Sequence, residues 1–177
     1  QRQMCIRDSP NAKVVIHEYT DFECPHCSIL NIMLQRIVSE LDNVKVVHHN
    51  FPLDTHCNSK IGVSIHENSC FIAKYALAAE FQGKYWNLNN YLFEYKPNNE
   101  EDILHFARQA GLNVGKLKED AASEKVAKRL EKSIDDAYNL KIIGTPSIII
   151  NSKVYTGIMP YYELKELLIK NGAKEKK

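Results

Sequence analysis

The chain has 177 residues, of which 44% are hydrophobic, enough for one globular domain or for one domain with an insertion. Its 23 basic and 22 acidic residues give a formal net charge of +1, which gives no indication of nucleic acid or an anionic membrane as a partner. No apolar run approaches the roughly 18 residues that span a bilayer. We therefore expect a soluble segment, which could be cut from a longer, membrane-attached protein.

The first nine residues resemble no part of a domain. They have neither the apolar core nor the small-residue cleavage site of a signal peptide. The chain begins with Gln1 instead of Met, which indicates a fragment or a processed chain. We expect residues 1–9 to lie outside the folded domain, and we give Cys5 no structural or functional role.

A strand, a helix and a second strand follow. Residues 14–19 form an apolar run typical of a buried strand, and residues 20–23 form a loop. Apolar residues then recur every three or four positions over 28–41, which predicts an amphipathic helix packed on a core. Residues 42–43 end this helix, and 44–51 read as the second strand. Two strands joined by a helix predict a right-handed unit with parallel strands.

The loop before the helix leads into Cys24, Pro25, His26 and Cys27. A helix start carries unpaired backbone N–H groups and the positive end of the helix dipole, and both stabilise a thiolate. The two-residue spacing puts the sulfurs one turn apart, within reach of a disulfide. We expect Cys24, at the exposed tip, to be the attacking thiolate and Cys27 to be the resolving thiol. Pro25 needs no N–H partner in the first turn, and His26, if protonated, would lower the pKa of Cys24.

A C-x-x-C pair is also half of many zinc sites. Such sites usually contain a second pair of ligands at short spacing, and no such pair follows here. The strand before the pair and the helix after it are the context of a thioredoxin-like redox site. We therefore predict redox chemistry, with no metal and no bound cofactor.

Between about residues 59 and 140 the pattern is helical. Predicted helices cover 70–81 and 84–93, one begins at Asn98 or Asn99, one begins at Asn113, and the longest covers 123–140. Asparagine at these starts is a favourable N-cap, and the acidic residues after Asn99 suit a first helical turn. These helices look like an insertion between two halves of a sheet and not like an independent domain.

Strand signals return near the C-terminus. Residues 147–150 and 154–155 predict a hairpin with a three-residue turn, and Pro160 begins a terminal helix. The charged tail at 174–177 reads as a solvated end. Before the hairpin, Gly144, Thr145 and Pro146 form either a simple turn or, in a thioredoxin-like fold, a cis-proline loop against the two cysteines. In that loop, the Thr145 backbone would pair with an extended substrate.

Three acidic residues lie near the cysteine pair. Glu18 lies on the strand, six residues before Cys24. A carboxylate beneath the disulfide would be desolvated, and could carry protons to or from Cys27. The alternative is that Glu18 lies on a solvated face of the strand. We expect Asp21 and Glu23 to be exposed and to oppose thiolate formation slightly.

Cys57 and Cys70 form a second cysteine pair. A disulfide between them would close a loop of about 15 residues and stabilise the fold by roughly 3 kcal/mol. They could instead be a second redox pair that passes electrons to the first, or could bind zinc with His56 and His66. We favour the structural disulfide, which also indicates an oxidising, extracytoplasmic compartment.

Taken together, these motifs resemble the DsbA family of thiol:disulfide oxidoreductases, from about residue 10 to residue 169. Glu18 and Tyr19 followed by the 24–27 motif match the family's strand, loop and CPHC arrangement, and residues 144–147 match its cis-proline loop. A subfamily resemblance, to thioredoxin-like domains fused to or working with bacterial vitamin K epoxide reductase homologues, involves residues 51–54, 57–58, His66, Cys70 and 82–86.

This resemblance implies an α/β, thioredoxin-like fold with a helical insertion. We expect one domain over 10–172, with a thioredoxin-like core formed by 10–57 and 141–172 and an insertion over 58–140. It also implies Cys24, Pro25, His26, Cys27 and Glu18 as catalytic residues and Thr145 and Pro146 as substrate-binding residues.

The predicted activity is the formation or exchange of disulfides in unfolded or reduced proteins outside the cytoplasm, by a monomer. A membrane redox partner, related to vitamin K epoxide reductase or to DsbB, would reset the pair. The alternatives are a reductase or isomerase of the same fold, a non-catalytic peptide-binding module, and a zinc-binding module. The Pro25–His26 dipeptide resembles oxidising members of the family, whereas Thr145 resembles isomerases and reductases.

Overall fold

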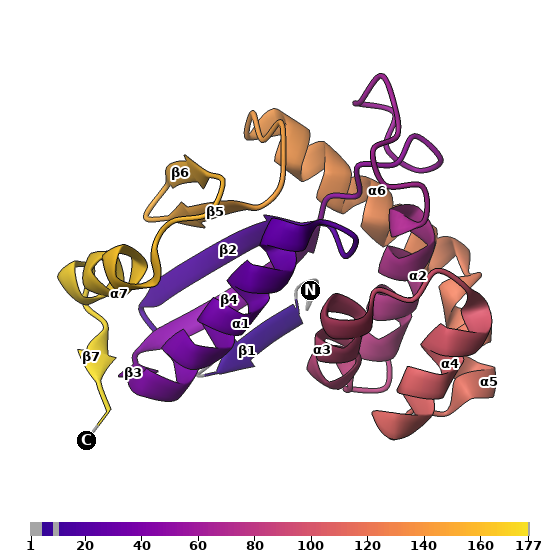
Figure 1. The fold of residues 1–177 in the computed structure, drawn as a ribbon, viewed down its shortest axis with the longest axis horizontal. Coiled ribbons are helices and arrows are strands. Elements are labelled where there is room, and N and C mark those ends of the chain that lie inside the picture. Colours follow the sequence, from indigo (N-terminus) through magenta and orange to yellow (C-terminus); the bar gives the residue numbers. More distant parts are fainter. Residues whose placement is uncertain (1–4, 9–10, 177) are drawn as a thin grey trace.

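We describe residues 5–8 and 11–176 in a computed structural model (Figure 1). A five-stranded sheet has the order β1-β4-β2-β5-β6, and two short strands, β3 and β7, pair apart from it. The strands are β1 Cys5–Asp8, β2 Val14–Thr20, β3 Leu41–Asp42, β4 Val44–Asn50, β5 Ser147–Ile150, β6 Lys153–Thr156 and β7 Lys174–Glu175. The helices are α1 Pro25–Glu40, α2 Ser69–Glu80, α3 Tyr85–Tyr95, α4 Glu100–Gln109, α5 Val114–Ala121, α6 Glu124–Asn139 and α7 Tyr161–Lys170.

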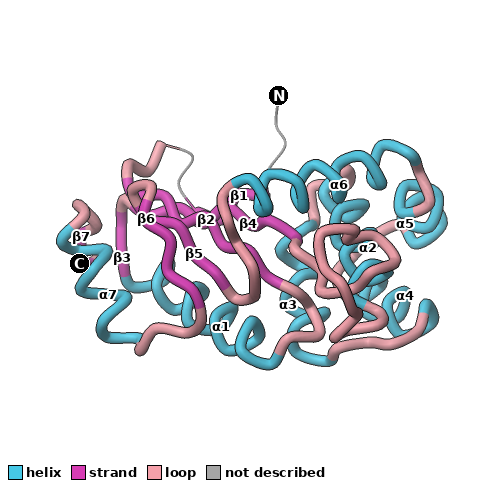
Figure 2. Tube along the Cα trace, turned by 90° about the horizontal axis from the view of Figure 1, so that it is seen from above, coloured by secondary structure: helices cyan, strands magenta, loops and turns pink. Residues whose placement is uncertain are grey.

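The centre of the sheet confirms the predicted thioredoxin-like fold. β2 and β4 are parallel and joined by α1, whereas β5 runs antiparallel to β2 and forms a hairpin with β6. Figure 2 shows α1 and α7 on the same side of these strands. Five helices, α2 to α6, are inserted between β4 and β5, and Figure 1 shows them gathered beside the sheet.

Two apolar clusters hold the molecule together. One joins α1 and α7 to the sheet, through side chains such as Leu34, Ile16 and Leu164. The other fills the insertion and extends to the sheet, and it includes Cys24 and Cys27. The cysteine pair therefore lies where the insertion meets the sheet.

Capping residues explain where the inserted helices begin. The side chains of Asn99, Asn113 and Ser123 accept hydrogen bonds from the backbone N–H groups three residues further on. These bonds satisfy donors that a helix start leaves unpaired. We predicted one cap at Asn98 or Asn99 and another at Asn113, and the structure places these caps at Asn99 and Asn113.

Both ends of the chain differ from the expectation. Cys5–Asp8 pair antiparallel with β4 and form the edge strand β1, although we expected residues 1–9 outside the domain; residues 1–4 and 9 lie outside the described chain. Lys174–Glu175 pair with Leu41–Asp42 instead of forming a solvated tail. Short edge strands such as these depend on a partner far away in the sequence, so local patterns do not reveal them.

The hairpin turn is shorter than predicted. β6 begins at Lys153, so only Asn151 and Ser152 connect the two strands. Both residues have positive φ angles, 49° and 64°, as a two-residue hairpin turn of the I′ type requires. Among the described residues, no helix is long and apolar enough to cross a membrane.

Candidate active site

Cys24 is the N-cap residue of α1, and Pro25 begins the helix. Cys24 has an extended backbone conformation (φ −68°, ψ 121°), which turns the chain from the loop into the helix. Cys24 and Cys27 are both free thiols. We predicted that Cys24 lies at an exposed tip, but packing against the insertion leaves only 6% of its surface exposed. Cys27 is completely buried. Pro25 and His26, between the two cysteines, are exposed.

The two thiols ionise in opposite directions. A hydrogen bond from the Cys27 side chain, together with the backbone amides at the helix start, lowers the pKa of Cys24 from 9.0 to about 5. Burial raises the pKa of Cys27 far above its ordinary value, and the neighbouring Cys24 adds to this rise. At neutral pH Cys24 is therefore a thiolate and Cys27 a protonated thiol.

The 144–147 loop lies directly against Cys24. The Thr145–Pro146 peptide bond is cis. The Cys24 Sγ atom lies 3.7 Å from the Thr145 carbonyl oxygen, across 121 positions of sequence. The Ser147 hydroxyl donates to the Gly144 carbonyl and closes the turn before β5. The substrate-binding residues predicted from the sequence therefore lie beside the predicted nucleophile.

Glu18 lies inside the molecule, on β2. Its side chain is 1% exposed, and its Oε1 atom lies 3.1 Å from Nδ1 of His48, which is directly across on β4. The His48 ring packs against Phe22 and Phe93. The alternative prediction, that Glu18 lies on a solvated face of the strand, is therefore wrong. His48 is a partner that the sequence did not reveal, because two strands had to be placed in register first.

The turn before Cys24 is built around a buried acid. We expected Asp21 to be exposed, but it is 1% exposed because the loop folds over it. One of its carboxylate oxygens accepts from the Leu53 backbone at 2.7 Å, and the other from the Glu23 backbone at 2.8 Å. Its carbonyl oxygen accepts from the Cys24 N–H at 3.2 Å. Asp21 thereby fixes the start of α1.

Two residues from a distant loop hold the same turn. His66 Nδ1 lies 3.0 Å from the Asp21 carboxylate, which raises the pKa of His66, and the charge of Cys24 adds to that rise. The Asn68 backbone donates to the Glu23 carboxylate at 2.8 Å. His66 thus lies within the electrostatic reach of Cys24, and a positive charge on its ring would favour the Cys24 thiolate. Neither contact could be read from the sequence, because the partners are about 45 positions apart.

Cys57 and Cys70 form a disulfide that closes the loop carrying His66 and Asn68. Asp54 links the two ends of this loop. The buried Asp54 carboxylate accepts hydrogen bonds from the Cys70 N–H at 3.2 Å and from the His56 ring at 2.7 Å. Across residues 5–8 and 11–176, no three His, Cys, Asp or Glu side chains gather as metal ligands would.

A thioredoxin-like sheet with a helical insertion and a thiolate at a helix start defines the class of this protein, a DsbA-like thiol:disulfide oxidoreductase. Residues 15–168 match the model of the DSBA-like thioredoxin domain. The chain belongs to this family.

Known relatives agree with this assignment. Disulfide bond formation protein D of Bacillus subtilis is 27% identical over 173 residues, covering 90% of this chain and 73% of that protein. The Na(+)/H(+) antiporter NhaA 1 of Salinispora arenicola is 26% identical over 153 residues, and here the chain spans 22% of the relative's length. Among solved structures, a thioredoxin-like oxidoreductase from Silicibacter pomeroyi DSS-3 has a TM-score of 0.83 and 26% identity, covering 97% of this chain and 93% of that one.

Proposed function

We propose that the chain forms or exchanges disulfides in unfolded or reduced extracytoplasmic proteins through Cys24 and Cys27. The observation that carries this proposal is the pair of free thiols at the start of α1, with the Cys24 Sγ atom 3.7 Å from the Thr145 carbonyl oxygen of the cis-proline loop. Their surroundings agree with it, because they lower the pKa of Cys24 and raise that of Cys27. In such a pair, one cysteine is a good nucleophile and leaving group, and the other is the thiol that resolves the mixed disulfide.

In the oxidising direction, a substrate thiolate attacks the Cys24 sulfur of the Cys24–Cys27 disulfide. The bond between the two cysteines breaks, and Cys27 takes up a proton. A second substrate thiolate then attacks the substrate sulfur, and Cys24 leaves as the stabilised thiolate. The substrate loses two electrons and the pair gains them. In the reverse direction, Cys24 attacks a substrate disulfide and Cys27 resolves the mixed disulfide.

The remaining predicted site residues support these steps. Glu18, buried and paired with His48, would exchange the proton of Cys27. The exposed His26, beside Cys24 in sequence, would add positive charge near the thiolate when protonated, and Pro25 would set the first turn of α1. Thr145 and Pro146 would present backbone groups to an extended substrate strand.

Apolar side chains near these segments suit unfolded proteins as substrates. Ile29, one turn beyond Pro25, is 47% exposed, and Ile143, beside the cis-proline loop, is 87% exposed. Ile65, next to His66, is 66% exposed. An unfolded chain offers the apolar residues that such a surface can cover.

The relatives and the disulfide support a proposal for the location, and the family resemblance supports one for the redox partner. The Cys57–Cys70 bond suits an oxidising compartment, periplasmic or otherwise extracytoplasmic. The match with part of an antiporter supports a membrane-tethered, full-length protein. A membrane enzyme related to vitamin K epoxide reductase or DsbB would reoxidise the pair, and the domain, proposed over 10–172, would act as a monomer.

The test is turnover on reduced and on scrambled protein substrates. We expect the wild-type chain to form or reshuffle disulfides and the Cys24→Ser variant to lose this activity. A Cys24→Ser variant with wild-type turnover would exclude the mechanism and favour a non-catalytic peptide-binding module. Circular dichroism of both proteins checks that the variant is folded.

A reductase or isomerase of the same fold is the second candidate. Thr145 before the cis proline favours it, because this residue resembles reducing and isomerising relatives. The redox potential of the Cys24–Cys27 pair separates the two: a value near about −270 mV would favour a reductase, and one near about −120 mV an oxidase.

A further inference from the structure

An irregular loop between β4 and α2 is closed at its ends by the Cys57–Cys70 disulfide (Figure 1). Between Cys57 and α2 the chain forms neither helix nor strand. Of its large apolar side chains, Ile61 packs against the core, but Val63 is 69% exposed and Ile65 is 66% exposed. A segment with few buried apolar contacts opens easily.

Other anchors of this loop are polar. Lys60 Nζ lies 2.9 Å from the Asp135 carboxylate, and both side chains are partly exposed, so this ion pair contributes little. The backbone N–H groups of Ile65 and His66 donate to the Leu53 carbonyl at 2.8 and 3.1 Å. Water replaces such bonds when a loop opens, which makes their net contribution small. The disulfide therefore accounts for much of what keeps the loop closed.

The loop carries two of the contacts that hold the turn before Cys24. His66 Nδ1 lies 3.0 Å from the Asp21 carboxylate, and the Asn68 N–H donates to the Glu23 carboxylate at 2.8 Å. The Asp21 carbonyl accepts in turn from the Cys24 N–H at 3.2 Å. Opening of the loop would break the first two contacts. The helix start, whose amides stabilise the thiolate, would then be less firmly held.

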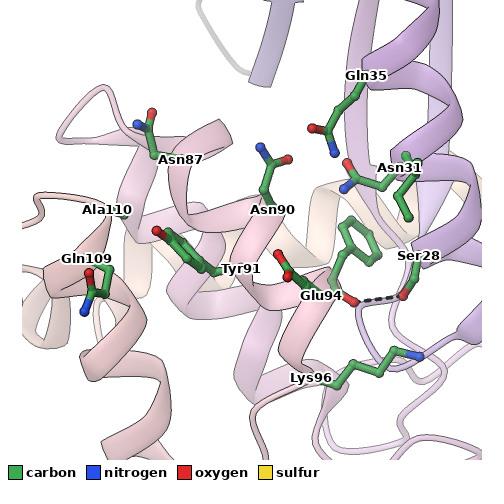
Figure 3. Close-up of a pocket in the computed structure, with 12 residues that line it drawn as sticks. Ser28, Asn31, Gln35, Asn87, Asn90, Tyr91, Glu94, Lys96, Gln109 and Ala110 are labelled. Carbon is green, nitrogen blue, oxygen red and sulfur yellow. Dashed lines mark hydrogen bonds between the residues drawn. The ribbon is translucent and has the colours of Figure 1, made fainter.

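A second support of the same turn comes from α3 and does not involve the loop. Lys96 Nζ donates to the Glu23 carbonyl at 3.4 Å. The Ser28 hydroxyl, on the first turns of α1, donates to the Phe93 carbonyl at 3.0 Å (Figure 3). Because these contacts remain when the loop opens, the site stays assembled. The loop can therefore change the reactivity of Cys24 without unfolding the domain.

The bond that closes the loop can be reached from solvent. Cys57 is partly exposed, whereas Cys70 is buried. A thiolate can therefore attack the Cys57 sulfur, so that the bond to Cys70 breaks and Cys70 leaves and takes up a proton. A second thiolate attacks the outer sulfur of the mixed disulfide, and Cys57 leaves. The cysteine pair gains two electrons, and the two small thiols lose them as they form their own disulfide.

We propose that the Cys57–Cys70 disulfide is a redox switch: low-molecular-weight thiols that reduce it slow the reaction of Cys24, and reoxidation restores that reaction. The proposal rests on the proposed function. A disulfide that closes a loop of about 15 residues disfavours its opening by roughly a hundredfold. Once the bond is reduced, the open loop is populated, and neither His66 nor Asn68 then holds the turn before Cys24.

The experiment compares three forms of the protein in a Cys5→Ser background, all with Cys24 and Cys27 reduced. In the first form the loop disulfide is closed, and in the second it is reduced. The third is the second form after reoxidation and selective reduction of the Cys24–Cys27 pair. Mass spectrometry after alkylation confirms each state. The rate of Cys24 with iodoacetamide is measured against pH, and at about pH 5 ordinary thiols hardly react.

Reducing the loop disulfide should move the midpoint of the rate profile up by about one pH unit, which slows Cys24 about fivefold at pH 5. The third form should recover the first rate. A Cys57→Ser, Cys70→Ser variant should react like the open form and ignore the reductant. His66→Asn with a closed loop should approach the open form, and reduction should add little, because both changes remove the same contact.

Asn113→Ala is the matched control. It removes the cap of α5, which lies elsewhere in the insertion, and so weakens the fold without touching the loop. With a closed loop its Cys24 should react at the wild-type rate, and reduction of the loop disulfide should slow it as much as in the wild type.

Equal Cys24 rates with an open and a closed loop disulfide would overturn the proposal. A Cys57–Cys70 bond that stays closed in excess reduced glutathione at neutral pH would also overturn it, as would a rate that does not recover on reoxidation. The proposed function fails on a different result, namely that the wild-type protein with a closed loop forms no disulfides in a reduced protein substrate. The two failures are therefore distinguishable.

Discussion

Cys24 and Cys27 share one helical turn, and their different surroundings set their chemistry. Cys24 accepts hydrogen bonds from Cys27 and from amides at the start of α1, which favour its charged form. Cys27 is completely buried, and burial favours its neutral form. This division makes Cys24 the better leaving group whenever a disulfide with it is broken.

The ionisation of Cys24 links the stability of the reduced protein to pH. Its pKa falls from 9.0 to about 5 on folding, so between these values the unfolded chain holds a proton that the folded chain releases. The free energy of unfolding of the reduced form should therefore rise with pH across this window. The contribution of Cys24 to stability should be lost as pH falls through about 5. The oxidised form has no thiol at this position and should lack this rise. Urea unfolding of both forms at about pH 5 and about pH 8 measures the difference; parallel pH dependences would contradict it.

His66 is expected to help to stabilise the Cys24 thiolate. Replacing it in His66→Asn removes the imidazole ring that faces the buried Asp21 carboxylate near the thiolate. We expect the pKa of Cys24 to rise, and the free energy of unfolding to fall by only about 1 kcal/mol, because the Asp21 carboxylate keeps its two backbone donors. Thiolate absorbance against pH measures the first effect, and urea unfolding the second.

His56→Asn is the matched control for His66→Asn. His56 directly precedes the same disulfide loop and pairs with a buried acid, Asp54, but its own side chain is 77% exposed. Among the described residues, its hydrogen bonds and its ion pair go to Asp54 and not to the turn before Cys24, so the pKa of Cys24 should stay unchanged. Equal effects of the two substitutions on this pKa would show that the segment as a whole, and not the contact of His66 with Asp21, is responsible.

At the level of elements, the loop closed by Cys57 and Cys70 carries the contacts that hold the turn before Cys24. Removing the disulfide in a Cys57→Ala, Cys70→Ala variant should lower the free energy of unfolding by about 3 kcal/mol, since a loop of about 15 residues gains conformational freedom when unfolded. Urea unfolding measures this. The variant should still oxidise substrates. Loss of turnover in a fully folded variant would instead assign the pair a role in electron transfer.

Local patterns predicted the central elements well. The apolar repeat of α1, the caps at Asn99 and Asn113 and the β2–α1–β4 unit depend on neighbours in sequence, and the structure confirms them. β1 and β7 depend on partners far along the chain and were not predicted. The site shows the same division, because the C-x-x-C spacing reveals the two cysteines but not the burial of Asp21 or the approach of His66.

At the level of the whole molecule, the site lies where two hydrophobic clusters meet. The sheet supplies Glu18 and the cis-proline loop, and the insertion buries both cysteines. This arrangement holds Cys24 where its thiolate is stabilised and Cys27 where its neutral thiol is favoured.

The Cys24 pKa also sets the redox potential. Thioredoxin, with a pKa of about 7, has a potential of about −270 mV, and DsbA, with a pKa of about 3.5, one of about −120 mV. A Cys24 pKa of about 5 therefore predicts an intermediate potential, because a stabilised thiolate favours the reduced form. Equilibration with glutathione measures it. A value below about −270 mV would contradict this relation.

The most direct test of the account is the rate at which reduced Cys24 reacts with iodoacetamide as pH is varied. A Cys5→Ser background removes the cysteine near the start of the chain, and mild reduction keeps the Cys57–Cys70 bond closed. The account predicts a sigmoid rate profile with a midpoint near pH 5, because the thiolate alone reacts. A midpoint near about 8.5, the value of an ordinary cysteine, would contradict it.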